Sequence, residues 1–382
     1  MDSGGAANSS LPEFRRALIG WLDEHLTPEL VGAARGGLDD PDQLEMLRAW
    51  NRVLADARWA APAWPAEHGG RDATVDEQLA YLEVMAEKGA PGPVNVIGVA
   101  NIAPAILEFG TQLQKDRFIA PLLRGDEIWC QGMSEPDAGS DLASLRTTAR
   151  LVGDAFVVDG QKTWNSLGHL ADWCQLYVRT DPEAPKHAGI SCLLVDMCTP
   201  GIEVSPVRTM AGDRTFSELF FSEARIPSSA LLGPLNDGWR VAMTTLSYER
   251  AGVAKFHLAL TDRFNELLEA TRKTGATVTP YYRDRLAQVY AKIACLRWTT
   301  ARELEAVGHG SRPRPAMGSM AKLLWSEISQ EVADLAVGVL GPAALERPWS
   351  TTLLGSVSSS IAGGTSEINR NIVGEHGLGL PR

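Results

Sequence analysis

Cysteine is scarce in this sequence of 382 residues, which has five, at positions 130, 174, 192, 198 and 295. Their number is odd and no two stand in a C-x-x-C pair, which disfavours both a disulfide framework and a zinc site of the usual spacing. The histidines also lack metal-ligand spacing, so we expect no metal. The first nine residues contain no basic stretch followed by an apolar one, and no signal peptide is predicted. A reducing compartment is the simplest expectation, and we predict a cytoplasmic protein.

Positive charge and long apolar runs are also in short supply. Lys and Arg number 36 against 47 Asp and Glu, a formal net charge of −11, which argues against nucleic-acid and anionic-membrane partners. The longest apolar run, 91–107, is interrupted by Asn95, Asn101 and Pro104, which is typical of buried helices and not of a membrane span. The sequence has no G-x-G-x-x-G fingerprint, which disfavours a nicotinamide-dependent Rossmann enzyme.

What the chain does have is a change of hydrophobic period near residue 127. Before it, apolar residues recur at helical spacing behind capping boxes such as Ser10–Glu13 and Thr74–Glu77. From there to about residue 234 the segments are short, rich in β-formers and bounded by turns, and hairpin turns are expected at Gly153-Asp154 and Asp159-Gly160. Beyond residue 238 the pattern is helical again, with one long helix expected over 239–271.

These patterns predict an α+β multi-domain fold. Residues 1–126 are expected to form an N-terminal all-α domain, residues 127–234 a central antiparallel β-domain, and residues 235–382 a C-terminal four-helix bundle. Apolar residues make up 45% of the chain, which is enough for a large core without a membrane.

The stretch 129–166 carries the candidate site. It reads W-C-Q-G-M-S-E-P-D-A-G-S-D, then a short hairpin, then D-G-Q-K-T-W-N-S. Small hydroxyl residues stand beside apolar or aromatic ones in both pieces, as a flat heteroaromatic cofactor requires: a hydrophobic wall and a few hydrogen-bond donors. The candidate cofactor-binding residues are Met133, Ser134, Ser140, Trp164 and Ser166. The alternative is a turn-rich piece of the β-domain, with Trp164 and Met133 in its core.

Both pieces, in this order, resemble the segments that hold the isoalloxazine ring of FAD in the acyl-CoA dehydrogenase family. Further matches are Pro65-Ala-Glu-His-Gly-Gly70, Glu249-Arg250, and the ending G-G-T-S-E-I-N-R with G-L-G-L-P-R. The resemblance spans nearly the whole chain. It implies an FAD-dependent enzyme that desaturates an acyl-CoA substrate to a trans-2-enoyl-CoA and passes electrons to an electron-transfer flavoprotein. It also implies a homotetramer, or a heterotetramer with a related chain.

The reaction that this resemblance implies requires a base, because an α-proton beside a thioester is only weakly acidic. In many family members the base is a glutamate just before the Gly-Thr of the last helix, where this chain has Gly363. A smaller group places the glutamate on the long helix after the β-domain, just before an arginine, and this chain has Glu249-Arg250 there. The hypothesis is that Glu249 is the catalytic base and that Arg250 positions it and contacts the substrate. The alternative is an ordinary solvated helix pair.

The resemblance also assigns roles around the last helix. Glycine at position 363 keeps the backbone N–H that, with a ribityl hydroxyl of FAD, binds the substrate carbonyl in the family, and Ser140 is a further substrate-binding candidate. Gly363 with Ala362 leaves room for a bulky, branched or ring-containing acyl group. Thr365 opens a helix whose free N–H groups favour anions or a polarised ring. The residues expected to contact FAD here are Gly364, Thr365 and Glu367.

Two family features at the other end of the cofactor are altered. Arg272 resembles an arginine that reaches the FAD pyrophosphate of a neighbouring subunit, but the aromatic residue that usually follows it is missing. A glutamine- and glycine-rich turn near the adenine reads Gly338-Val-Leu-Gly-Pro342, without the glutamine. The first alternative function is therefore a partner subunit that supports the FAD site of a heteromeric dehydrogenase and has no activity alone. A second alternative is a relative that oxidises its substrate with O₂.

Overall fold

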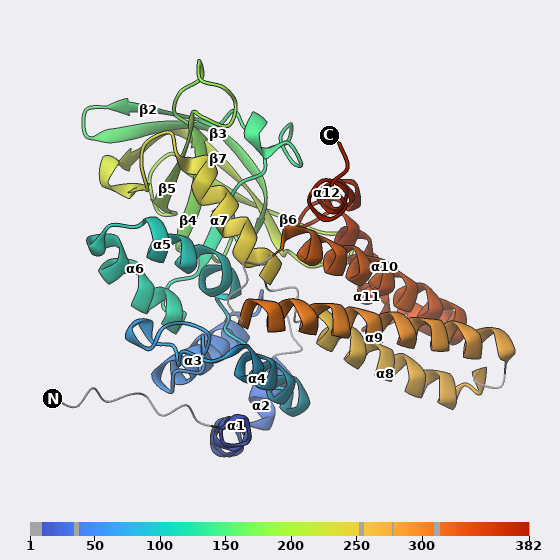
Figure 1. Ribbon diagram of the computed structural model, residues 1–382. Coiled ribbons are helices and arrows are strands. Elements are labelled where there is room, and N and C mark those ends of the chain that lie inside the picture. Colours follow the sequence, from blue (N-terminus) through green and yellow to red (C-terminus); the bar gives the residue numbers. More distant parts are fainter. Residues whose placement is uncertain (1–9, 34–37, 252–255, 277–278, 309–313, 382) are drawn as a thin grey trace.

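The structure of the protein is a computed structural model that describes residues 10–33, 38–251, 256–276, 279–308 and 314–381. Three parts follow one another along the chain, namely a group of helices, a large sheet and a set of long helices (Figure 1). The predicted fold, with an N-terminal helical domain, a central β-domain and a C-terminal helical bundle, is confirmed. The bundle projects from the other two parts as an arm (Figure 1).

The N-terminal domain is a cluster of short helices. They are α1 (Leu11–His25), α2 (Pro28–Ala33), α3 (Pro41–Asp56), α4 (Val75–Lys88), α5 (Ala103–Phe109) and α6 (Gln112–Arg124), with a 3₁₀ turn η1 (Ala66–His68) and a π-helical turn η2 (Gly98–Ile102). The predicted capping boxes are present: at the start of α4 the Thr74 N–H donates to Glu77 at 2.8 Å, and the Glu77 N–H donates to Thr74 Oγ1 at 3.3 Å. These bonds satisfy N–H groups that have no partner within the helix.

The central domain is one twisted sheet. Its strands are β1 (Trp129–Gly132), β2 (Thr148–Val152), β3 (Ala155–Ser166), β4 (Trp173–Arg179), β5 (Ile190–Asp196), β6 (Ile202–Val207), β7 (Phe216–Pro227) and β8 (Leu231–Leu232). The strand order is β6-β7-β3-β2-β4-β5-β8, with β1 beside β4. The pairs are antiparallel except where β1 and the end of β2 meet β4. The long strands β3 and β7 pair along most of their length, and β3 runs on into the candidate site.

The hairpin turn expected at Asp159-Gly160 is wrong, because β3 continues through these residues to Ser166. The register between β3 and β7 shifts between Val158 and Gly160, which marks a bulge and not a turn. Gly160 has φ +147°, and a Cβ atom there would lie 2.7 Å from the Cα of Thr147. The glycine therefore allows two strands to approach closely. The turn expected at Gly153-Asp154 is confirmed, since it joins β2 to β3.

The C-terminal part consists of long helices joined by short connections. They are α7 (Gly238–Ala251), α8 (Phe256–Lys273), α9 (Pro280–Gly308), α10 (Pro315–Leu340), α11 (Trp349–Ser356) and α12 (Ser366–Ile372), with the short turns η7 (Gly341–Leu345), η8 (Val357–Ser360) and η9 (Val373–Gly377). The single helix expected over 239–271 corresponds to α7 and α8, and residues 252–255 between them lie outside the described residues.

The helices α10 and α7 have different roles in packing. Buried residues of α10, including Ile328 and Val332, form the core of the arm with α8 and α9. Among the described residues, α10 is the one helix long and apolar enough to cross a bilayer, and it lies within the bundle. By contrast, α7 lies against the sheet, where Val241 and Ala242 join the core that contains Cys192 of β5. The first turns of the C-terminal part therefore rest on the β-domain (Figure 1).

The bulge predicts a stability difference between two glycines of β2–β3. Gly160→Ala is expected to lower the melting temperature of the protein, because its Cβ would collide with the backbone of Thr147 in addition to the strain of the positive φ. Gly153→Ala is the control, since it has φ +67° but nothing within 4 Å of the added Cβ, and it should cost only about 1 kcal/mol. Equal melting temperatures of the two variants in a thermal shift assay would contradict the close approach.

Candidate active site

Hydrogen bonds join the two segments that carry the candidate cofactor residues. The Thr163 N–H donates to the Ser134 carbonyl at 2.9 Å, and Asn165 Nδ2 donates to the Gln131 carbonyl at 2.6 Å. Lys162 Nζ adds a bond of 3.0 Å to the carbonyl of Met133. The end of β3 therefore lies alongside the chain that leaves β1, and the structure brings Met133 and Ser134 next to the segment that holds Trp164 and Ser166.

A buried ion pair supports this arrangement. Lys162 is 0% exposed and Glu135 is 8% exposed, and Lys162 Nζ donates to Glu135 Oε1 at 2.8 Å. The same carboxylate accepts the backbone N–H groups of Arg146 at 2.6 Å and Thr147 at 2.9 Å. Burial raises the pKa of Glu135, but the charge of Lys162 and these hydrogen bonds outweigh burial and leave the pKa below its usual range. Glu135 is thus ionised at neutral pH, and its carboxylate holds three parts of the chain together.

Trp164 is not part of the core, so the interpretation of Trp164 as a core aromatic is wrong. Its side chain is 61% exposed, its φ is +61°, and the register between β3 and β7 shifts around it. The ring meets Phe216 edge to face, with ring centroids 5.8 Å apart. A left-handed conformation is costly for a tryptophan, so the surrounding strands must impose it. The consequence is an indole that stands at the surface, where a flat ligand can contact it.

Several polar groups near this indole lack a hydrogen-bond partner among the described residues. In the part of the chain that the structure describes, the hydroxyls of Ser134 and Ser166 make no hydrogen bond to protein. Asn165 Oδ1 and Ser217 Oγ, from neighbouring positions of β3 and β7, are buried without a partner in that same part. Ser140 is exposed on the loop that follows Glu135. An apolar ring with hydroxyl donors around it fits the edge and face of a flavin ring.

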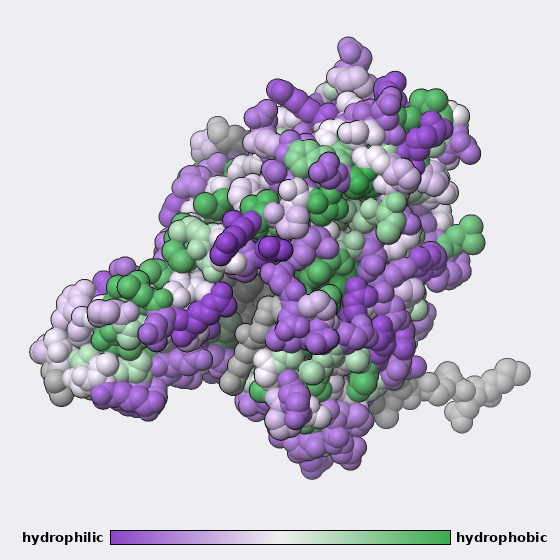
Figure 2. All heavy atoms as spheres, turned by 180° about the vertical axis from the view of Figure 1, so that it is seen from behind, coloured by the Kyte–Doolittle hydropathy of each residue, from purple (hydrophilic) through white to green (hydrophobic). Residues whose placement is uncertain are grey.

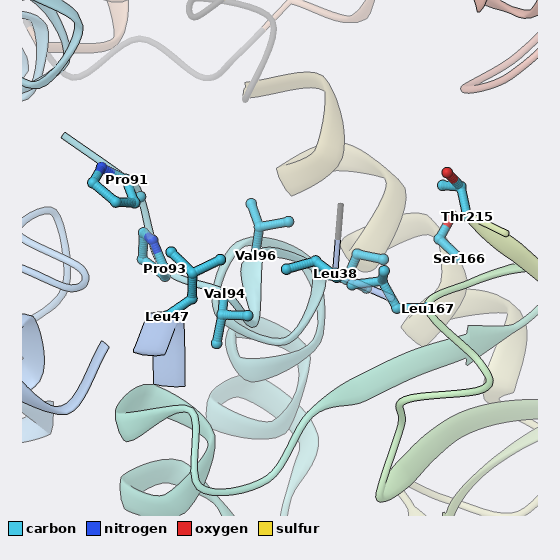
Figure 3. A pocket seen from close by; sticks show the side chains of 11 residues that line it. Leu38, Leu47, Pro91, Pro93, Val94, Val96, Ser166, Leu167 and Thr215 are labelled. Carbon is cyan, nitrogen blue, oxygen red and sulfur yellow. The ribbon is translucent and has the colours of Figure 1, made fainter. Parts of the chain in front are cut away.

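An apolar cavity of about 470 Å³ opens next to Ser166 (Figure 3). Ser166, Leu167 and Thr215 line one side of it at the ends of β3 and β7, and the rest of the lining comes from the N-terminal domain. The lining residues from that domain are Leu38, Leu47, Pro91, Gly92, Pro93, Val94, Val96 and Ile97. Figure 3 shows Val96 and Leu38 between Ser166 and the proline-rich side. The cavity lies where the two domains meet, which is a common place for a small-molecule site.

The candidate catalytic pair lies at the end of α7. Glu249 and Arg250 belong to the last turn of this helix, and their side chains are outside the part that the structure describes. One turn earlier, Thr245 is buried against Gln175 and Tyr177 of β4. The structure therefore places the backbone of position 249 on a helix that rests on the sheet.

The turn before the last helix has left-handed backbone at two successive glycines. Gly363 has φ +64° and Gly364 has φ +89°. Lys322 of α10, which is buried, donates to the Gly364 carbonyl at 2.5 Å, and Asn369 Nδ2 donates to the same oxygen at 2.8 Å. Thr365 caps α12 by accepting the Ile368 N–H at 3.2 Å. Thr365 is thus the N-cap of α12, and Gly363 keeps its backbone N–H.

Arg272 and the altered turn lie together at the far end of the arm. Arg272 lies in the last turn of α8, is exposed, and forms a loose ion pair with Glu269 at 3.8 Å. The next helix begins close by, and the hydroxyl of Tyr282 donates to the Gly338 carbonyl at 2.7 Å. Tyr281, which is exposed, contacts the Tyr282 ring edge to face. This end of the arm is remote from the sheet (Figure 1), so the end of α8 lies far from the candidate cofactor residues of β1 and β3.

The candidate residues thus fall into separate groups. The structure brings Met133, Ser134, Trp164 and Ser166 together at the sheet, while Gly364, Thr365 and Glu367 lie at the junction of α10 and α12. No hydrogen bond or ion pair between described residues joins these two groups. The sequence analysis did not single out Lys162, Glu135 or Lys322. Glu135 and Lys162 lie inside the two cofactor-binding pieces, and their opposite charges could have suggested an ion pair between those pieces.

Comparison with known proteins gives a consistent result. Models of the acyl-CoA dehydrogenase N-terminal, middle and C-terminal domains match residues 11–126, 130–224 and 236–378. The chain is 38% identical to acyl-CoA dehydrogenase IpdE1 of Mycolicibacterium smegmatis, over 97% of this chain and 98% of that protein. It is 35% identical to acyl-CoA dehydrogenase FadE26 of Mycobacterium tuberculosis, over 97% of each.

Solved structures give the same picture. The Tcur3481-Tcur3483 steroid ACAD superposes with a TM-score of 0.86 at 30% identity, over the full length of both chains. The ChsE4-ChsE5 complex from Mycobacterium tuberculosis superposes with a TM-score of 0.84 at 32% identity, again over both full chains. Each of these two structures is named after a pair of proteins, Tcur3481 with Tcur3483 and ChsE4 with ChsE5.

The buried ion pair predicts a large loss of stability when one partner is removed. Lys162→Met keeps the length of the side chain but leaves the Glu135 carboxylate buried without its counter-ion, and should destabilise the protein by about 3–5 kcal/mol. Lys186→Met is the matched control, because its ion pair with Asp141 is exposed on both sides and should matter little. Denaturant unfolding followed by circular dichroism measures both, and similar midpoints for the two variants would contradict a structural role for Lys162.

Proposed function

The chain belongs to the acyl-CoA dehydrogenase family, and from this premise we propose that it is an FAD-dependent dehydrogenase that desaturates the α,β bond of a bulky acyl-CoA thioester. The observation that carries the proposal is the exposed, left-handed Trp164 beside the free hydroxyls of Ser134 and Ser166, together with an apolar groove of about 470 Å³ that Ser166 lines. One wall suits a flat cofactor and the adjoining space suits an apolar substrate.

We assign the isoalloxazine end of FAD to Met133, Ser134, Trp164 and Ser166. When bound there, FAD would accept the β-hydrogen of the substrate together with its electron pair. Glu249 takes the α-proton, and the electron pair of the broken Cα–H bond becomes the new α,β double bond. The Gly363 N–H is assigned to the thioester oxygen, where negative charge develops as the proton leaves. Arg250 and Ser140 are assigned to substrate contacts, and Gly364, Thr365 and Glu367 to further contacts with FAD.

The backbone at position 363 supports a base on α7. Its φ of +64° is a conformation that glycine adopts freely and that costs a glutamate roughly 1 kcal/mol or more. Lys322 and Asn369 both bond the next carbonyl, so the turn is not free to relax. Position 363 carries no carboxylate in this chain, and position 249 offers one on a helix that packs on the sheet.

The cavity supports a bulky acyl group. Its lining is mostly apolar, and it continues from Ser166 to the proline-rich loop of the N-terminal domain (Figure 3). A similar chain is described as a steroid ACAD, which makes a fused-ring acyl group the first class to test.

Partner chains complete the proposal. The arm carries apolar patches at its surface (Figure 2), and its exposed side chains include Tyr290 and Trp298. Arg272 at the tip of this arm is suited to the FAD pyrophosphate of a neighbouring subunit, in a homotetramer or in a heterotetramer with a related chain. We propose an electron-transfer flavoprotein as the electron acceptor.

The cysteines within the described residues are all unpaired, which supports a cytoplasmic location.

A second candidate function is a subunit that completes the FAD site of a related chain and is inactive alone. The altered turn 338–342 favours it, because Tyr282 is bonded to Gly338, and two similar structures are described as pairs of components. The visible spectrum of the chain purified alone separates the two candidates. A flavin band supports a complete site, and a colourless protein supports the second candidate.

The assignment of Glu249 predicts a loss of activity without loss of cofactor. Glu249→Gln should slow anaerobic flavin reduction by acyl-CoA by about 10²–10⁴-fold, since no carboxylate remains to take the α-proton. The flavin content should stay unchanged. Glu266→Gln, an exposed glutamate of α8 paired with Arg263, is the control. Flavin reduction by Glu249→Gln at the rate of the control would rule out Glu249 as the base.

The assignment of the cavity predicts a change in substrate preference. Val96→Phe should fill part of the cavity and lower kcat/KM for fused-ring acyl-CoAs by roughly tenfold or more, with a much smaller effect on a four-carbon acyl-CoA. Leu113→Phe, on the exposed face of α6, is the control. An equal loss for both substrate classes would remove the link between this cavity and the acyl group.

A further inference from the structure

Three buried polar side chains connect α7 to the sheet. The hydroxyls of Tyr177 and Thr245 lie 3.1 Å apart, and Gln175 Nε2 donates to Thr245 Oγ1 at 3.3 Å. Each of the three residues is fully buried. Gln175 and Tyr177 are two positions apart on β4 and therefore point to the same face of the sheet, so together they hold one hydroxyl of α7 from two directions.

The same set of bonds continues to the proposed flavin segment. Gln131 Nε2 donates to Gln175 Oε1 at 3.3 Å, and the backbone carbonyl of Gln131 accepts Asn165 Nδ2 at 2.6 Å. Asn165 lies between Trp164 and Ser166 on β3. A continuous series of polar contacts thus leads from α7, through β4 and β1, to the residues assigned to the cofactor.

Apolar contacts alone do not explain this interface. Val241 and Ala242 of α7 are buried against the core that includes Cys192, and this apolar burial is non-directional. A buried hydroxyl that leaves its partners strands polar groups away from water, at a cost of about 1–3 kcal/mol each. Burial raises the pKa of Tyr177 well above its usual range, so the phenol keeps its proton at neutral pH and the contact persists.

Helical geometry relates this contact to the proposed base. Positions 241, 245 and 249 follow one another at intervals of four and share one face of α7. We propose that Gln175, Tyr177 and Thr245 are positioning residues, which fix the rotation and depth of α7 on the sheet and thereby fix the place of position 249 relative to β4. This inference rests on the proposed function for its catalytic consequence, but the anchoring itself does not depend on it.

The test compares three variants of the full chain. Thr245→Val removes the hydroxyl and preserves the shape, Thr245→Ser restores the hydroxyl, and Thr300→Val removes a buried hydroxyl of α9 that bonds only carbonyls of its own helix. Hydrogen–deuterium exchange of the α7 amides is measured in all three. Thr245→Val should accelerate exchange at the end of α7 by about tenfold or more relative to Thr300→Val, and Thr245→Ser should return it towards the wild-type rate.

Flavin reduction by an acyl-CoA panel is measured in the same proteins. Thr245→Val should lower kcat by about tenfold with KM and flavin content nearly unchanged, since a misplaced base affects the chemical step more than binding. Unchanged exchange in Thr245→Val would overturn the proposal whatever the activity. Faster exchange with the kcat of Thr300→Val would overturn the positioning role. If no acyl-CoA reduces the flavin of the wild-type protein, the proposed function is refuted. The anchoring of α7 is still tested in that case, because hydrogen–deuterium exchange does not depend on activity.

Discussion

The candidate site depends on one buried charge pair between segments 27 residues apart. Neither Lys162 nor Glu135 would be tolerated alone in this interior, because an unpaired buried charge is strongly destabilising. The ion pair therefore requires the end of β3 to lie beside the loop after β1. Glu135 extends the constraint to the backbone of Arg146 and Thr147. With Lys162 fixed, the residues that follow it can hold Trp164 in a left-handed conformation and present its ring outwards.

Much of the fold was predictable because its signals are local. The capping box at Thr74 and Glu77, the change of period near residue 127 and the return to helices after Gly238 each follow from neighbouring residues, and the structure agrees. The turn predicted at Asp159-Gly160 was wrong, because an Asp-Gly pair is a local signal for a turn. Here the glycine is needed because any side chain would collide with Thr147, and that contact arises only when the strands pair. A glycine at position 160 would suit a tight turn, and it also suits the close approach to Thr147, so the sequence alone does not distinguish the two cases.

The site was predictable in part for the same reason. Ser134, Trp164 and Ser166 were recognisable because they belong to two compact motifs, and the structure brings those motifs together. The roles of Lys162, Thr245 and Tyr177 were not, since each depends on a partner from a distant strand or helix. Sequence spacing carries no information about such pairs. The cavity beside Ser166 arises likewise, at a junction between two domains.

The two ends of the C-terminal part illustrate how a base could change its place in the chain. A left-handed turn at Gly363, with its next carbonyl bonded by Lys322 and Asn369, disfavours a long acidic side chain but still offers an N–H. The start of the same part, α7, is held on the sheet by apolar residues and by the buried hydroxyl of Thr245. A reaction that needs a base and an oxyanion donor on a fixed geometry can take them from different elements, provided that both are rigid. In this chain the rigidity of α7 comes from β4, the strand that also adjoins the flavin segment, so the proposed base and the proposed cofactor wall share one support.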